Sequence, residues 1–117
     1  MRIVTRSTLT GFVQNRVPRG ERRLVAEHLQ AWFKLVKAAR WASSAELKAQ
    51  LRSASIVSAQ RVVFNIKGND YRLVAGINYL SQAIFIKWIG THAEYDKIDV
   101  STVRYEEERY GNLSDQR

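Results

Sequence analysis

Residues 61–97 read RVVFNIKGNDYRLVAGINYLSQAIFIKWIGTHAEYDK, and this stretch decides the fold. Two apolar runs flank Gly68-Asn69, and a third apolar run follows a polar break. Gly-Asn between such runs predicts a hairpin, because glycine supplies the positive φ that a type II′ turn needs at its first central position. The predicted strands cover residues 61–66, 71–79 and 83–90.

A turn at Gly68-Asn69 fixes which residues pair across the hairpin. Asn65 then lies opposite Arg72. Because side chains alternate along a strand, one face of the hairpin is apolar and collects Val62, Phe64, Ile66, Tyr71, Leu73 and Ala75. The opposite, polar face collects Asn65, Lys67 and Arg72, with Val63 and Val74 beyond them. A sheet face with two cations and an amide is where we expect the functional site.

The third strand adds a further candidate to that face. Simple alternation from Ile84 places Ile84, Ile86 and Trp88 on one side and Phe85, Lys87 and Ile89 on the other. Lys87 is therefore predicted to join the polar face. The register across residues 80–82 stays open at this point.

The segments before the hairpin are predicted to form a strand and the helices that pack on the apolar face of the sheet. They read as a strand at residues 1–5, a short helix capped by Ser7, a longer amphipathic helix over 20–41, a helix over 43–51 with the capping-box pair Ser43 and Glu46, and a connection over 52–60. The connections between the later strands are short, so those strands are antiparallel. The predicted fold class is α+β, with the N-terminal strand and helices packed on one face of a small, mainly antiparallel sheet.

Composition limits the class of protein. The chain has 117 residues and no cysteine, which suits one domain with its own core and excludes thiol catalysis and disulfides. We find no apolar run near the roughly 18–20 residues of a membrane span and no signal peptide, so we expect a cytoplasmic protein without a membrane partner. The sequence also lacks a convincing metal cluster, and we expect no metal or other cofactor.

Charge is unevenly distributed along the chain. The net charge of +8 comes from residues 1–60, while residues 61–97 carry +2 and residues 98–117 carry −2. A basic body of this size predicts a polyanionic partner such as nucleic acid, although solubility alone or an acidic protein would also suit it. We expect one domain over residues 1–99 and an acidic tail over residues 100–117.

The densest group of reactive polar residues directly follows the third strand. Residues 91–97 read THAEYDK, and one helical turn would bring His92 and Tyr95 to the same side. An imidazole and a phenol can both transfer protons. With Lys67 and Arg72 nearby, this inventory suits cleavage of an RNA phosphodiester, where proton transfers and cations on the phosphate suffice.

Each of these residues also has an ordinary structural role. Arg72 could pair with Asp70 or Glu94, and Tyr95 could be a core tyrosine with a wet hydroxyl. Asn65 and Asn69 could be strand and turn residues only. His92 could cap the strand end. The residues alone leave both readings open.

The run RVVFNIKGNDYRLV, followed by a strand and THAEYDKID, resembles the HigB family of bacterial toxins within the RelE/ParE superfamily. The resemblance covers about residues 1–99. It implies a RelE-like fold and a toxin that cleaves mRNA on the ribosome through attack of the 2′-hydroxyl. It also implies a HigA-like helix-turn-helix antitoxin as partner, and binding of operator DNA only through the antitoxin complex.

The resemblance further implies roles for single residues. Lys67, Arg72, His92 and Tyr95 match the positions expected to act in catalysis, with Arg72 on the phosphate, Lys67 stabilising charge, and the other two transferring protons. Asn69 also matches the family's polar sheet face, and we expect it to contact RNA together with Asn65 and Lys87 of the predicted polar face. Two alternatives remain at this point: a ParE-like gyrase inhibitor with the same fold, and a basic RNA- or ribosome-binding module without catalysis.

Overall fold

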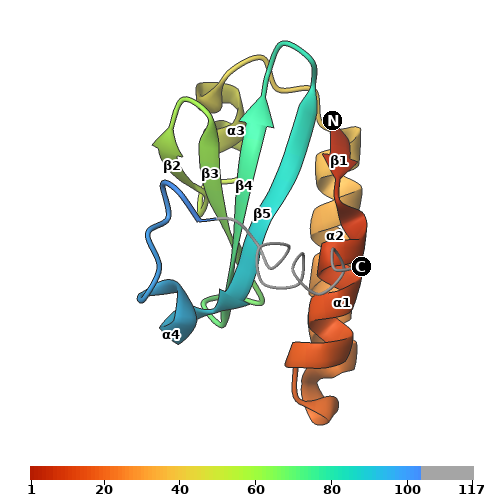
Figure 1. Ribbon diagram of the computed structural model, residues 1–117. Coiled ribbons are helices and arrows are strands. Elements are labelled where there is room, and N and C mark those ends of the chain that lie inside the picture. The colour runs from red at the N-terminus through yellow and green to blue at the C-terminus, as the bar shows by residue number, and fades with distance from the viewer. Residues whose placement is uncertain (104–117) are drawn as a thin grey trace, which may run out of the picture.

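The computed structural model describes residues 1–103 and contains a five-stranded sheet with two long helices along one side (Figure 1). The strands lie in the order β1-β5-β4-β3-β2. Strand β1 pairs parallel to β5, and the other neighbours are antiparallel. The strands are β1 Arg2–Val4, β2 Ser55–Ser58, β3 Arg61–Ile66, β4 Tyr71–Asn78 and β5 Ala83–Thr91. This confirms the predicted α+β fold class.

The helices also follow the prediction, with shifts of a few residues. They are α1 Arg6–Arg16, α2 Arg22–Ala38, α3 Ser44–Gln50 and α4 His92–Tyr95, with a 3₁₀ turn at Arg19–Glu21. The predicted cap at Ser7 is wrong, because α1 begins at Arg6 after Thr5. The predicted cap at Ser43 is confirmed: its hydroxyl accepts a hydrogen bond from the Glu46 N–H at 3.3 Å.

The main core lies between α1, α2 and the apolar face of the sheet. Phe12 of α1 meets Tyr71 edge-on at 5.7 Å between ring centroids, and Trp32 of α2 meets Phe64 in the same way at 5.3 Å. The buried residues of α2 are Val25, Leu29, Trp32 and Val36. They recur at helical spacing, as expected for one buried stripe. The neighbouring Leu24 is exposed.

A second, smaller cluster lies on the opposite face of the sheet. Val63, Val74 and Trp88 are buried there beneath the segment that follows β5. Arg61 fastens this segment, because its Nη1 donates to the carbonyls of Val100 at 3.2 Å and Val103 at 2.8 Å. The first residues of the predicted acidic tail therefore contact the sheet. The rest of that tail, residues 104–117, lies outside the described residues.

Two further findings bear on the predicted class of protein. No helix within residues 1–103 has both the length and the apolar content needed to cross a membrane. In the same part of the chain, His, Asp and Glu side chains form no group of three or more that could hold a metal ion.

Candidate functional site

The β3–β4 hairpin has the predicted register and a modified turn. Ile66 pairs with Tyr71, and Asn65 pairs with Arg72. Gly68 has φ +65, and the Asp70 N–H donates to the Lys67 carbonyl at 3.1 Å, as a turn centred on Gly68-Asn69 requires. Lys67 also has a positive φ of 57°, and β3 ends at Ile66, just before it.

This backbone conformation removes Lys67 from the alternation of β3. Its ammonium lies 2.7 Å from the Asp70 carboxylate. The hydrogen bond to Asp70 raises the pKa of Lys67, and the charges of Asp70, Glu21 and Tyr71 also act to raise it. Tyr71 belongs to the apolar face under α1. Strand alternation thus does not place Lys67 beside Asn65 and Arg72, and that part of the prediction is wrong.

Arg72 is held by backbone carbonyl groups. Its Nη1 donates to the Asn69 carbonyl at 3.1 Å and to the Tyr71 carbonyl at 3.4 Å. Its predicted carboxylate partners are occupied elsewhere: Asp70 pairs with Lys67, and Glu94 lies 2.9 Å from Arg16. Within residues 1–103 no carboxylate forms a salt bridge with Arg72. The guanidinium is therefore positioned, and no acid in the described part of the chain neutralises its charge through a salt bridge.

Helix α4 brings Tyr95 to this guanidinium. The Arg72 Cζ lies 5.9 Å from the centroid of the Tyr95 ring. A capping box begins the helix: the Thr91 hydroxyl accepts from the Glu94 N–H at 3.1 Å, and the Glu94 carboxylate accepts from the Thr91 N–H at 2.8 Å. The THAE motif in the sequence is a readable signal for this turn.

His92 opens the same helical turn. Its backbone N–H donates to the Asp70 carbonyl at 3.0 Å, which ties α4 to the end of the hairpin. The imidazole is exposed, and its Nε2 lies 3.9 Å from the Asp96 carboxylate. His92 and Tyr95 thus occupy the first and last positions of α4, at the same end of the sheet as Arg72.

Trp88 supports the site, and it lies on the opposite face from the one that simple alternation along β5 predicts. Across β4 and β5, Val74 pairs with Trp88 and Ala75 with Ile86, so Lys87 is an extra residue in a β-bulge. The bulge moves Trp88 to the polar face, where its ring centroid lies 6.4 Å from that of Tyr95. It also moves Ile89 into the main core. No sequence signal for the bulge was recognised.

The structure thus brings together some of the predicted site residues and separates others. Arg72, Tyr95 and His92 gather at the hairpin end of the sheet, with Asn69 in the adjoining turn. Asn65 pairs with Arg72 on the polar face and is partly exposed. Lys87 lies toward the opposite end of this face, near Phe85 and Gly76.

Gly90 allows Trp88 and Glu94 to pack closely against β5. A Cβ at this position would lie 2.4 Å from the Trp88 ring and 2.6 Å from the Glu94 carboxylate, which is too near for either atom to stay in place. Gly90 is also the strand partner of Arg72. The absence of a side chain here therefore allows Trp88 and α4 to approach the strand that carries Arg72.

We predict that Gly90→Ala lowers the free energy of unfolding by about 1–3 kcal/mol, the usual range for overpacking. It should also slow any reaction that uses Tyr95, because the Trp88 ring supports that side chain. Gly11→Ala is the matched control, since its new Cβ would meet only Asn15 at 4.0 Å within a helix. Urea unfolding of both variants measures the difference. Equal stability of the two would contradict the prediction.

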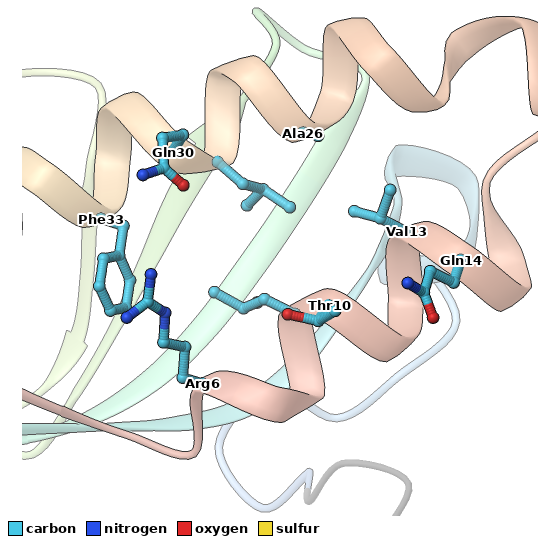
Figure 2. A pocket seen from close by; sticks show the side chains of 9 residues that line it. Arg6, Thr10, Val13, Gln14, Ala26, Gln30 and Phe33 are labelled. Atoms are coloured by element: carbon cyan, nitrogen blue, oxygen red, sulfur yellow. The ribbon is translucent and has the colours of Figure 1, made fainter.

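A hollow lies between α1 and α2, and its chemistry differs from that of the hairpin end (Figure 2). Its volume is about 250 Å³. Arg6 is the charged residue among those that line it within the described part of the chain, and its guanidinium stacks on Phe33 with 3.9 Å from Cζ to the ring centroid. Among residues 1–103 no His, Tyr or carboxylate lines this groove, so these residues do not offer the proton-transfer groups found at the hairpin end.

Comparison with known proteins gives two findings. A profile of the HigB_toxin family, described as the RelE-like toxic component of a toxin-antitoxin system, matches residues 25–98. That range includes β2 to β5 and α4. Over 36 residues the chain is 44% identical to the mRNA interferase HigB of Escherichia coli O6:H1. The second match covers 31% of this chain and 35% of that protein, about a third of each.

Proposed function

This chain belongs to the HigB toxin family, the RelE-like toxic components of toxin-antitoxin systems, and on that premise we propose that it is an mRNA interferase. It would cleave mRNA bound to the ribosome in the cytoplasm and so inhibit translation. The observation that carries the proposal is the Arg72 guanidinium, which is held by turn carbonyls, has no acidic partner among residues 1–103, and lies 5.9 Å from the Tyr95 ring.

The proposed reaction needs no redox step or added group. The 2′-hydroxyl of one nucleotide loses its proton and attacks the adjacent phosphorus. A bond forms between the 2′-oxygen and phosphorus, the bond to the 5′-oxygen breaks, and the leaving 5′-oxygen takes up a proton. The products are a 2′,3′-cyclic phosphate and a 5′-hydroxyl. We propose that this route proceeds without a metal ion.

Arg72 suits the phosphate in this reaction. Negative charge builds up on the non-bridging oxygens as the 2′-oxygen attacks, and a fixed cation stabilises that charge more than the charge of the ground state. A guanidinium presents parallel N–H donors that match two phosphate oxygens. Lys67 adds positive charge at the edge of the site, although its ammonium is shared with Asp70.

The proton transfers fall to His92 and Tyr95. Both side chains lie on α4, and both residue types can donate and accept protons. The Tyr95 ring lies near both the Trp88 ring and the Arg72 guanidinium. Variants of His92 and Tyr95 assign the base and the acid.

The family implies an antitoxin as a partner, and we propose one with a helix-turn-helix domain that neutralises the toxin and binds operator DNA for the complex. The polar face would meet mRNA and the ribosome, with Asn65 and Asn69 as further RNA contacts. Asn65 pairs with Arg72 across the hairpin, and Asn69 lies in the exposed turn.

The direct test is to induce the protein under tight control and map mRNA 5′ ends as growth stops. We expect new ends with 5′-hydroxyl groups inside coding regions, and no such ends when translation initiation is blocked beforehand. Intact messages in arrested cells would refute the proposal. Inhibition of DNA supercoiling by the purified protein, with mRNA intact, would favour a gyrase inhibitor instead.

A further inference from the structure

A broad hollow lies on the polar face, away from the hairpin end. Its volume is about 660 Å³, and it opens where the β2–β3 turn, the end of β4 and the start of β5 meet. The residues that matter here are Arg61, Gly76, Tyr79, Phe85, Lys87 and Ser101. None of them belongs to the group formed by Arg72, His92 and Tyr95.

The bulge in β5 gives this hollow its cation. Lys87 is the extra residue of the bulge, and its Cε lies 3.0 Å from where a Cβ on Gly76 would be. The ammonium lies 5.8 Å from the centroid of the Phe85 ring. Because Gly76 has no side chain, the Lys87 side chain can lie across its backbone, with the ammonium near the partly exposed Phe85 ring.

The surroundings favour an anion over a cation as ligand. No Asp or Glu is among the residues that line the hollow in the described part of the chain, and Lys87 forms no salt bridge there. Asp99 is a nearby carboxylate, and hydrogen bonds from the Ser101 hydroxyl and N–H lower its pKa, with the charge of Arg61 acting in the same direction. That carboxylate is therefore already engaged.

Proteins that bind single-stranded RNA commonly combine an aromatic ring with a nearby cation. A nucleobase stacks on the ring, and the phosphate next to it binds the ammonium. Such contacts depend little on base identity, since every base offers a flat face. Leu80 at the rim is 96% exposed and adds apolar surface for a second base or a ribose.

We propose that this hollow binds a nucleotide of single-stranded RNA that lies a few positions away from the cleaved bond. The inference deepens the proposed function and rests on it for the identity of the RNA. Arg72 and Gly76 lie on the same face of β4, four residues apart, which is about 13 Å along a strand. The segment that follows β5 covers Val74 between these two places, so one RNA strand that contacts both must pass over this segment. Binding here would hold mRNA while Arg72 engages the scissile phosphate.

The test uses the purified full chain and a fluorescein-labelled RNA nonanucleotide with 2′-O-methyl riboses, which cannot be cleaved. Binding is followed by fluorescence anisotropy. Phe85→Leu should weaken binding about tenfold through lost stacking. Lys87→Gln should weaken it and lower the slope of log affinity against log salt by about 0.7, as expected for one lost phosphate contact on a single strand. Phe85→Leu should leave that slope unchanged.

The matched control is Lys34→Gln, which removes the same charge from an exposed position on α2. It should bind within about twofold of the unmodified chain because surface charges away from the RNA act weakly. Thermal unfolding checks that each variant is folded. Unchanged affinity in both Phe85→Leu and Lys87→Gln would overturn the proposal, as would failure of the unmodified chain to bind the RNA.

Two further outcomes separate this inference from the proposed function. Loss of RNA binding in the hollow variants, with no mRNA cleavage by the unmodified protein in cells, would support an RNA site and refute the nuclease. Cleavage that depends on Arg72, with hollow variants that bind RNA normally, would refute the hollow and keep the nuclease. A defect confined to antitoxin binding would make the hollow a protein site and overturn the proposal.

Discussion

Arg72→Ala is expected to slow mRNA cleavage by about 10²–10³-fold, the usual loss when one fixed charge or donor is removed from a developing oxyanion. The reason is that Arg72 is positioned by the Asn69 and Tyr71 carbonyls and is not neutralised by a salt bridge within residues 1–103. Its positive charge is therefore available to a phosphate. In cells the variant should lose toxicity, and in single-turnover assays on programmed ribosomes the cleavage rate should fall.

The variant should remain folded, because Arg72 is partly exposed and the main core lies on the opposite face of the sheet. Arg72→Lys should recover only part of the rate, since an ammonium keeps the charge and loses the paired donors. Arg23→Ala removes the same charge from a side chain that is 92% exposed on α2, and it should change the rate little. Full toxicity of Arg72→Ala would mean that the site lies elsewhere.

The hairpin could be predicted from sequence because one local signal determines it. The turn needs a positive φ, which Gly68 adopts readily. Once the turn is placed, the pairing of Asn65 with Arg72 follows by counting residues outward from it. The apolar face was predicted in the same way, since a one-residue slip would put every side chain on the wrong side. These predictions required no information about the rest of the molecule.

The bulge at Lys87 could not be predicted in this way. A bulge adds one residue to one strand, whereas simple alternation assumes that every successive residue points to the opposite face. Every position after Lys87 in β5 is therefore reversed: Trp88 joins the cluster that supports Tyr95, and Ile89 enters the core. Gly76 lies under the aliphatic part of the Lys87 side chain, but it indicates the bulge only once the pairing of the strands is known.

Lys67 shows a second kind of failure. Its positive φ belongs to a turn conformation that non-glycine residues adopt uncommonly, so the alternation of side chains could not be extended from Ile66 to Lys67. By contrast, the capping box of α4 was present in the sequence as Thr91 and Glu94 and could have been used to fix the helix start. The proton-transfer pair depends on that helix.

The second large effect is expected for Tyr95→Phe. Loss of a proton-transfer group from a positioned side chain typically costs about 10²–10⁴-fold in rate. Phenylalanine keeps the ring that packs against Trp88, so the fold and the position of α4 should be preserved. The hydroxyl is the only group removed, and a fall in the cleavage rate can then be assigned to it. Antitoxin binding and thermal unfolding should match those of the unmodified chain.

His92→Gln separates the two roles. If His92 and Tyr95 act in the same step, the double variant should be little slower than the slower single variant, because groups that act as a unit lose their effects together. If each residue serves a different proton transfer, loss of the base should remove the part of the pH profile in which the cleavage rate rises with pH. Loss of the acid should leave that part of the profile unchanged. A Tyr95→Phe protein with full activity would remove Tyr95 from the mechanism and leave His92, exposed beside Asp96, as the remaining proton-transfer group on α4.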